Sequence, residues 1–156
     1  MHSVGGLMVL DCIASGTVWI DMEKLGVDAL ISAPQKGWTG PSCVGIVMLS
    51  ERGVEATRNS KSDSFVCDLR KWMELMESYE AGGFMYHATM PTDALMTFRD
   101  VMFETKAIGF EKIEAQAWEL GKLVRDTMSS KGLISVAAEG CAEIAPTPRQ
   151  EISAPT

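Results

Sequence analysis

The stretch Ser32-Ala33-Pro34-Gln35-Lys36-Gly37-Trp38 decides the fold, because it places a lysine in a tight, glycine-flanked loop directly after an apolar run. Proline has no backbone N–H for a sheet ladder, so the preceding strand must end at Pro34. Two glycines and a proline within residues 37–41 keep the chain in a loop. The sequence therefore predicts that Lys36 lies on a loop that follows a strand.

Three short apolar runs around this loop predict strands, over residues 6–10, 28–32 and 44–49. The first run is apolar without alternation, so we expect both of its faces to be covered. Between the first two runs, Asp21 predicts the N-cap of a short helical turn and Gly26 predicts its end. The succession of strand, turn, strand, loop and strand is typical of an α/β sheet.

Helices are predicted after the third run. Residues 68–79 carry apolar side chains at helical spacing, which we interpret as core: Leu69, Trp72, Met73, Leu75, Met76 and Tyr79. A long helix is expected over residues 91–108 and is broken by Gly109. A further helix, over residues 110–130, has one apolar side formed by Ile113, Ala117, Leu120, Leu123, Val124 and Met128. Residues 133–137 predict one more strand, which the end of the chain leaves without a partner.

Composition is that of an acidic chain long enough for one domain, with 156 residues and a formal net charge of −7. It has no dense basic cluster, so we expect no nucleic-acid partner. The four cysteines lie far apart without a C-x-x-C pair, which indicates free thiols in a reducing compartment and no metal site. No apolar stretch approaches the length of a membrane span, so a cytoplasmic protein is expected.

Two side chains at the ends of apolar runs indicate chemistry at one edge of the sheet. Ligands of open α/β sheets bind beyond the carboxyl ends of strands, where Asp11 and Lys36 are both expected. A lysine there can act as a nucleophile or form a Schiff base, and the protonated pyridine nitrogen of pyridoxal phosphate would satisfy a carboxylate. The alternatives are a surface lysine in a turn, and an aspartate that caps the following turn or pairs with an arginine.

Three runs of the sequence together resemble class V pyridoxal-phosphate aminotransferases. They are LDCIAS at residues 10–15, DALISAPQKGW at residues 28–38 and MYHATMP at residues 85–91. Their order and intervals match the family, and the alanine–glyoxylate and serine–glyoxylate enzymes are the most similar subgroup. The resemblance covers roughly residues 7–140.

The resemblance implies an α/β fold that is part of the fold type I aminotransferase large domain, with a mixed, mostly parallel sheet and flanking helices. Residues 1–109 would form the second half of this pyridoxal-phosphate-binding domain. Residues 110–140 would form a linking helix and the start of a small α+β domain. Residues 141–156 are expected to be a disordered tail.

By the same resemblance, Lys36 is the catalytic lysine, which binds the cofactor covalently and later moves a proton. Asp11 would pair with the pyridine nitrogen, and Ile13 would pack under the ring. Gln35 would lie beside the cofactor, near its phosphate or O3′.

The Y-x-x-T turn carries a further implication of the resemblance. In this family its Tyr and Thr reach the phosphate bound in the other subunit, so Tyr86 and Thr89 imply a homodimer with shared sites. His87, between them, is expected to be a packing neighbour and not a catalyst.

The activity that the resemblance implies is transamination between a small amino acid, alanine or serine, and a 2-oxo acid such as glyoxylate. The family's N-terminal phosphate cup and stacked aromatic residue have no counterpart in the sequence. The family's late substrate-binding arginine has none either, since Arg149 lies in a Pro-rich tail. We therefore expect the middle portion of an enzyme, with weak cofactor binding and no useful transamination by this chain alone.

Two alternatives stay open. The chain could be a truncated, catalytically silent product that keeps an α/β fold and residual cofactor or partner binding. A fold-related lyase acting on cysteine or selenocysteine is less favoured, because no cysteine stands in an obvious catalytic loop.

Overall fold

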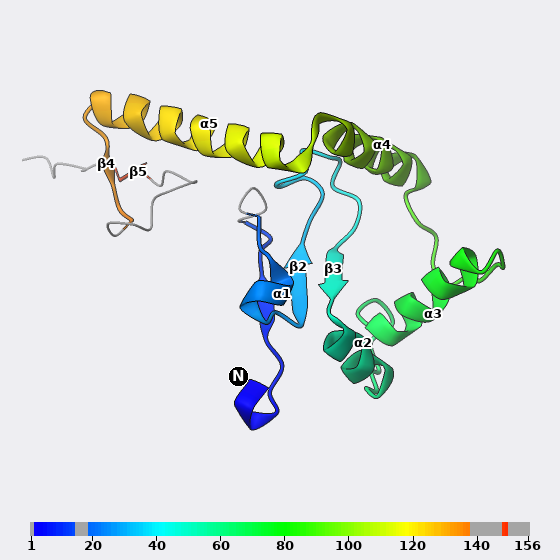
Figure 1. The fold of residues 1–156 in the computed structure, drawn as a ribbon. Coiled ribbons are helices and arrows are strands. Elements are labelled where there is room, and N and C mark those ends of the chain that lie inside the picture. Colours follow the sequence, from blue (N-terminus) through cyan, green and yellow to red (C-terminus); the bar gives the residue numbers. More distant parts are fainter. Residues whose placement is uncertain (1, 15–18, 138–147, 150–156) are drawn as a thin grey trace, which may run out of the picture.

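A computed structural model describes residues 2–14, 19–137 and 148–149 (Figure 1). A 3-10 turn, η1, covers His2–Val4. The strands are β1 (Val9–Asp11), β2 (Ala29–Ser32), β3 (Ile46–Leu49), β4 (Ile134–Ser135) and β5 (Pro148–Arg149). The helices are α1 (Met22–Leu25), α2 (Glu51–Arg58), α3 (Leu69–Glu80), α4 (Thr92–Ile108) and α5 (Phe110–Ser130).

The first three strands form a mixed sheet in the order β1-β2-β3, as expected for an α/β fold. β1 pairs with β2 in parallel and Asp11 stands opposite Ile31, whereas β2 and β3 are antiparallel. The parallel ladder continues one residue further, because Cys12 N–H donates to the Ile31 carbonyl at 2.8 Å. Since parallel strands run the same way, the carboxyl ends of β1 and β2 lie at one edge of the sheet.

The buried core of the sheet is small and consists of Cys12, Val27 and Leu30, against which Met8, Leu10, Ile20 and Met22 pack. The expectation that both faces of the first strand are covered is wrong. Leu7 is 41% exposed and Val9 is 58% exposed. Successive side chains of an extended chain point to opposite faces, so Met8 and Leu10 reach the core while Leu7 and Val9 face away from it.

The short helical turn before β2 is confirmed. Asp21 Oδ1 accepts a hydrogen bond from Lys24 N–H at 2.9 Å, which caps α1. Gly26 ends the turn with a φ of 65°, a left-handed conformation that glycine adopts at little cost. α1 therefore ends at Leu25, and only residues 26–28 separate it from β2, which begins at Ala29.

Asp28, directly before β2, joins three separate segments. Its side chain is buried, and its Oδ2 accepts a hydrogen bond from Met8 N–H at 2.8 Å and lies 2.8 Å from His2 Nε2. Oδ1 accepts from the Ser50 hydroxyl at 3.1 Å, and Arg52 Nε lies 3.5 Å away. The Met8 N–H, followed by His2 and Ser50, holds the pKa of this carboxyl below its ordinary value although burial opposes that shift.

The long helices occupy the predicted places, but their apolar sides are only partly covered. Gly109, with a φ of 100°, separates α4 from α5 as expected. Interpreting the whole apolar stripe of α3 as core is wrong, since Met76 and Tyr79 are 55% and 51% exposed. On α5, Leu120 and Leu123 are 61% and 63% exposed. The reason is that the helices and strands in substantial contact with α3 and α5 are those next to them in the chain, α2 for α3, and α4 and β4 for α5, so much of each helix surface has no neighbour in the described residues.

The expectation that the last strand lacks a partner is also wrong. β4 pairs with β5 in an antiparallel ladder, with Ile134 opposite Arg149 and Ser135 opposite Pro148. Unpaired N–H and C=O groups on a strand edge favour such pairing. The remainder of the predicted disordered tail, residues 141–147 and 150–156, lies outside the described residues.

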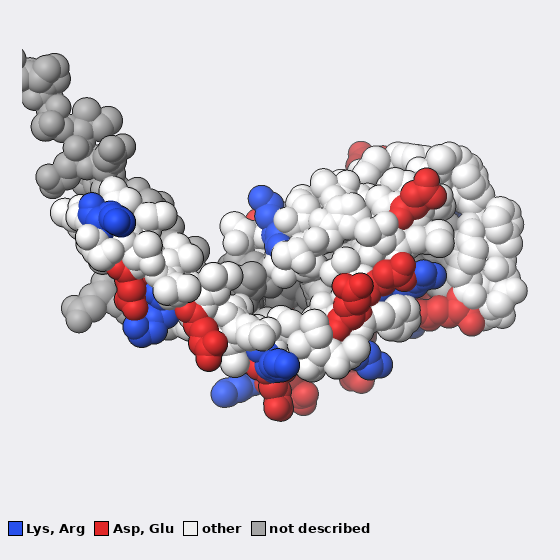
Figure 2. Space-filling model, turned by 90° about the horizontal axis from the view of Figure 1, so that it is seen from above, with Lys and Arg blue, Asp and Glu red and all other residues white. Residues whose placement is uncertain are grey.

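Charged side chains of both signs are mixed on the surface. Figure 2 shows blue and red groups close to one another on the face seen from above. Two ion pairs on the long helices illustrate this mixing, Arg99 with Asp100 at 2.7 Å and Lys122 with Asp126 at 2.6 Å. No helix in the described part of the chain is long and apolar enough to cross a membrane.

Candidate active site

Asp11 stands at the carboxyl end of β1, where the sequence places it, but its environment differs from the expected one. The side chain is exposed, so no buried cation is needed to keep it charged. Its Oδ1 accepts a hydrogen bond from Ile13 N–H at 3.0 Å, which is the turn-capping arrangement considered as the alternative. Ile13 is half-buried on the same turn. Because Oδ1 accepts this local hydrogen bond, Oδ2 is the oxygen with the greater remaining capacity to accept from a ligand cation.

Lys36 lies on a closed loop, as predicted. Its N–H donates to the Ala33 carbonyl at 3.3 Å, its own carbonyl accepts from Thr39 N–H at 3.2 Å, and Gly40 N–H donates to the Pro34 carbonyl at 2.9 Å. Ala33 and Pro34 are buried at the base of the loop. The loop is therefore anchored at its base and closed by hydrogen bonds of its own backbone.

The outer end of this loop carries the side chains that chemistry would use. Gln35 and Lys36 are both exposed. Thr39 has a φ of 53°, in a left-handed region that β-branched residues rarely adopt. The loop thus exposes the Lys36 side chain, and its backbone is strained at Thr39, three residues later. The parallel pairing of β1 and β2 brings this loop and Asp11 to the same edge of the sheet.

The Y-x-x-T turn lies elsewhere, on the connection between α3 and α4. Tyr86 Oη and Thr89 Oγ1 are 3.0 Å apart and share a hydrogen bond, and both residues are exposed. In Figure 1 this connection lies on the far side of β3 from β1 and β2. The described structure therefore brings Asp11 and Lys36 to one edge but does not bring Tyr86 and Thr89 to them.

His87 packs within the same connection, as expected for a packing neighbour. Its Nε2 lies 2.9 Å from the Phe65 carbonyl oxygen. Its ring lies 4.3 Å from the Phe65 ring and 5.0 Å from the Trp72 ring, between centroids. These contacts tie the Y-x-x-T turn to the start of α3.

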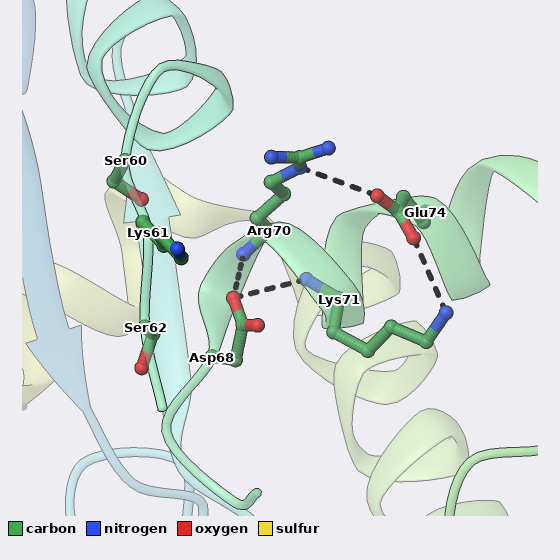
Figure 3. Close-up of a pocket in the computed structure, with 7 residues that line it drawn as sticks. All are labelled: Ser60, Lys61, Ser62, Asp68, Arg70, Lys71 and Glu74. Atoms are coloured by element: carbon green, nitrogen blue, oxygen red, sulfur yellow. Dashed lines mark hydrogen bonds and ion pairs between the residues drawn. The ribbon is translucent and has the colours of Figure 1, made fainter. Parts of the chain in front are cut away.

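A separate polar pocket of about 170 Å³ lies at the start of α3 (Figure 3). The Asp68 carboxylate accepts hydrogen bonds there from the backbone N–H groups of Arg70 and Lys71, at 3.1 and 3.3 Å. Glu74 pairs with both side chains, at 3.3 Å from Arg70 and 3.2 Å from Lys71. Carboxylates of the chain therefore already pair with Arg70 and Lys71, and neither Asp11 nor Lys36 lines this pocket, so it is not the candidate site.

Two structurally important residues are not marked by the sequence pattern. Asp28 lies before β2, at the end of that strand opposite the Lys36 loop, and an aspartate before an apolar run is the only signal that points to it. Trp38 receives no role, although it stands two residues after the lysine, and its ring contacts come from segments far away in the sequence.

The residues present have the donor chemistry for pyridoxal phosphate. A primary amine at Lys36 suits its aldehyde, and a free carboxylate oxygen at Asp11 suits its pyridine nitrogen. The sequence model of the aminotransferase class-V family matches residues 1–147. The chain belongs to the class-V aminotransferase family.

Individual relatives agree with this family. The chain is 28% identical to alanine–glyoxylate aminotransferase 1 of Saccharomyces cerevisiae over 76% of its own length and 31% of the relative. It is 32% identical to serine–glyoxylate aminotransferase of Arabidopsis thaliana over 72% of its own length and 27% of the relative. The chain thus spans about a third of the length of the curated relatives it matches.

The fold is also shared with solved aminotransferases. The crystal structure of ureidoglycine–glyoxylate aminotransferase from Bacillus subtilis superposes with a TM-score of 0.77, at 20% identity, over 91% of this chain and 36% of that one. The class-V chain described here accordingly has part of the fold type I architecture.

Proposed function

We propose that this class-V chain is part of a pyridoxal-phosphate-dependent aminotransferase. Its sheet edge at the carboxyl ends of β1 and β2 carries the catalytic lysine, Lys36. The parallel pairing that brings Asp11 and the Lys36 loop to one sheet edge supports this proposal most directly. The activity proposed for the whole enzyme is transfer of an amino group from alanine or serine to a 2-oxo acid such as glyoxylate. When bound, pyridoxal phosphate supplies an electron sink for a carbanion next to the transferred nitrogen.

The roles of the chain's own residues follow from their chemistry. The Nζ atom of Lys36 attacks as the neutral amine and later holds the proton that is moved. Asp11 holds the proton of the pyridine nitrogen through its Oδ2 atom, since Oδ1 accepts from the backbone. Ile13 packs under the ring face, and Gln35, exposed beside Lys36, donates to the phosphate or to O3′.

Tyr86 and Thr89 are proposed to donate their hydroxyl groups to the phosphate bound by a second copy of the chain. Their exposure and their separation from the Lys36 edge support a role outside their own site. This proposal includes a homodimer with shared sites. We further propose residues 1–109 as cofactor domain, residues 110–140 as the start of a small domain and a cytoplasmic location for the protein.

The experiment that tests the proposal is trapping of the lysine. The 156-residue chain is mixed with pyridoxal phosphate, reduced with borohydride and digested, and the modified lysines are mapped by mass spectrometry. We expect modification of Lys36 several-fold above that of Lys61 and Lys112, which are exposed lysines outside the loop. Lys36→Ala should remove the selective adduct and leave the other two unchanged. Equal modification of all three lysines in the unaltered chain would contradict the proposal.

A further inference from the structure

The Lys36 loop is joined to the long helices by four aromatic rings from four segments. The Trp38 ring meets the Phe98 ring of α4 edge-on, with centroids 6.0 Å apart and planes at 81°. Trp19, before α1, lies 6.1 Å from Trp38 and 5.3 Å from Phe110, the first residue of α5. These separations are those at which aromatic pairs attract one another beyond simple burial.

The base of the loop packs on the same phenylalanine. A Cβ atom at Gly40 would lie 3.1 Å from Phe98 Cδ2 and 3.5 Å from Pro34 Cβ, so the backbone there fits closely against the ring. Phe98 is only 7% exposed and is the buried residue of α4. The loop therefore covers Phe98 with both its closing residue and its tryptophan.

Lys36 lies between these two anchor points. Pro34 is buried two residues before it, and Trp38 packs two residues after it. The hydrogen bonds from Lys36 N–H to Ala33 and from Thr39 N–H to the Lys36 carbonyl fix the lysine backbone relative to both. The exposed Lys36 side chain stays free to change rotamer. The fold can therefore orient it only through the backbone, which sets the direction of the Cα–Cβ bond.

We propose that Trp38 is a positioning residue that clamps the Lys36 loop on Phe98 of α4 and, through Trp19 and Phe110, to the junction of α4 and α5. The effect of this clamp on the reactivity of Lys36 rests on the function proposed above. The effect of the clamp on the mobility of the loop backbone does not. The clamp acts on the lysine through the backbone, so Trp38 itself touches no reacting atom. Replacing the ring by a non-aromatic side chain should free the loop, and another aromatic ring should largely restore it.

Hydrogen exchange tests the clamp without any cofactor. The amides of Thr39 and Gly40 close the loop and report its opening. Trp38→Leu keeps an apolar side chain but removes the ring, and it is expected to speed their exchange about tenfold, while Trp38→Phe stays within about threefold of the unaltered chain. Trp118→Leu is the matched control, because Trp118 lies in α5 and is not one of the four aromatic rings. It should leave the exchange rates of both amides unchanged. Unchanged exchange in Trp38→Leu, or equal acceleration in the Trp118 control, would overturn the proposal.

Lysine trapping tests the consequence at Lys36. With pyridoxal phosphate and borohydride, we expect Trp38→Leu to lower the ratio of Lys36 to Lys61 modification several-fold, and Trp38→Phe to restore it. If Lys36 is not selectively modified in the unaltered chain, the proposed function fails, and the exchange data alone decide the clamp. A further outcome is possible when Lys36 is selectively modified in the unaltered chain. If Trp38→Leu then speeds hydrogen exchange at Thr39 and Gly40 but leaves the ratio of Lys36 to Lys61 modification unchanged, Trp38 does not position the lysine and the inference is overturned.

Discussion

The backbone N–H of Met8 donates a hydrogen bond of 2.8 Å to the buried Oδ2 of Asp28. This bond, ahead of those from His2 and Ser50, lowers the pKa of Asp28 from its ordinary value of 3.8. A carboxyl whose folded pKa is lowered stabilises the fold above its unfolded pKa, and that stabilisation is lost as the pH falls through the folded pKa. We expect the Asp28 contribution to be constant above about pH 5, to fall progressively below that, and to be lost completely only at a pH below the lowered folded pKa. Urea unfolding at pH 7, 5 and 3 measures this loss.

Asp28→Asn should remove the same contribution at neutral pH. The amide nitrogen of Asn is a donor and cannot accept from both Met8 and Ser50 as the carboxylate does. We expect a melting temperature several degrees lower at pH 7 and a weaker dependence of stability on pH between 5 and 3. Circular dichroism melts provide both values. A variant with unaltered stability at pH 7 would show that the network around Asp28 does not hold β2 to the η1 and α2 segments.

Gly53→Ala reverses the usual effect of alanine in a helix. Alanine normally favours a helix over glycine by about 1 kcal/mol. At Gly53, however, a Cβ atom would overlap the carbonyl oxygen of Asp28. Overpacking costs about 1–3 kcal/mol, and the cost should lie at the upper end here because the overlapped atom belongs to the backbone. After the helix-propensity gain of about 1 kcal/mol, we expect the free energy of unfolding to fall by about 1–2 kcal/mol. Gly45→Ala is the matched control, since a Cβ atom there meets nothing within 4 Å. Equal stability of the two variants in urea unfolding would contradict the close approach of α2 to Asp28.

Local signals in the sequence predicted most elements because their causes are local. Asp21 and Gly26 bound α1 by a cap and a left-handed residue that need no distant partner. Pro34 and the residues after it likewise set the Lys36 loop. The common edge for Asp11 and Lys36 is predicted because both follow apolar runs of an expected α/β sheet, whereas the mostly parallel sheet is an implication of the family resemblance.

Burial could not be predicted in the same way, because it depends on what lies opposite. Leu120 and Leu123 match the periodicity of a buried helix face and are nevertheless exposed. The contacts that hold the Lys36 loop and the amino end of β2 also join residues far apart in sequence, as Trp38 with Phe98 and Asp28 with His2 do. An aromatic or acidic residue does not reveal such a partner by its spacing.

Thr39→Gly should stabilise the chain. Thr39 has a φ of 53°, and a left-handed conformation costs a non-glycine residue about 1–2 kcal/mol. Glycine removes that cost but loses about 0.5–1 kcal/mol through greater freedom in the unfolded chain. We expect a net gain of up to about 1.5 kcal/mol in the free energy of unfolding. Ser42→Gly, an exposed loop position without a left-handed φ, should instead lower stability slightly. A loss of stability in Thr39→Gly would argue against strain in the Lys36 loop.

Tyr86→Phe separates a local role of the Y-x-x-T turn from a role in binding. The lost hydrogen bond to Thr89 is exposed, so stability should change by less than about 0.5 kcal/mol. If the hydroxyl donates to a phosphate, a charge-assisted bond of about 1.5–3 kcal/mol is lost. The dissociation constant for pyridoxal phosphate should then rise about 10- to 100-fold in a spectroscopic titration. Tyr79→Phe, which alters the chain's other tyrosine, is the matched control and should leave that constant unchanged. An equal affinity in both variants would remove Tyr86 from the proposed phosphate site.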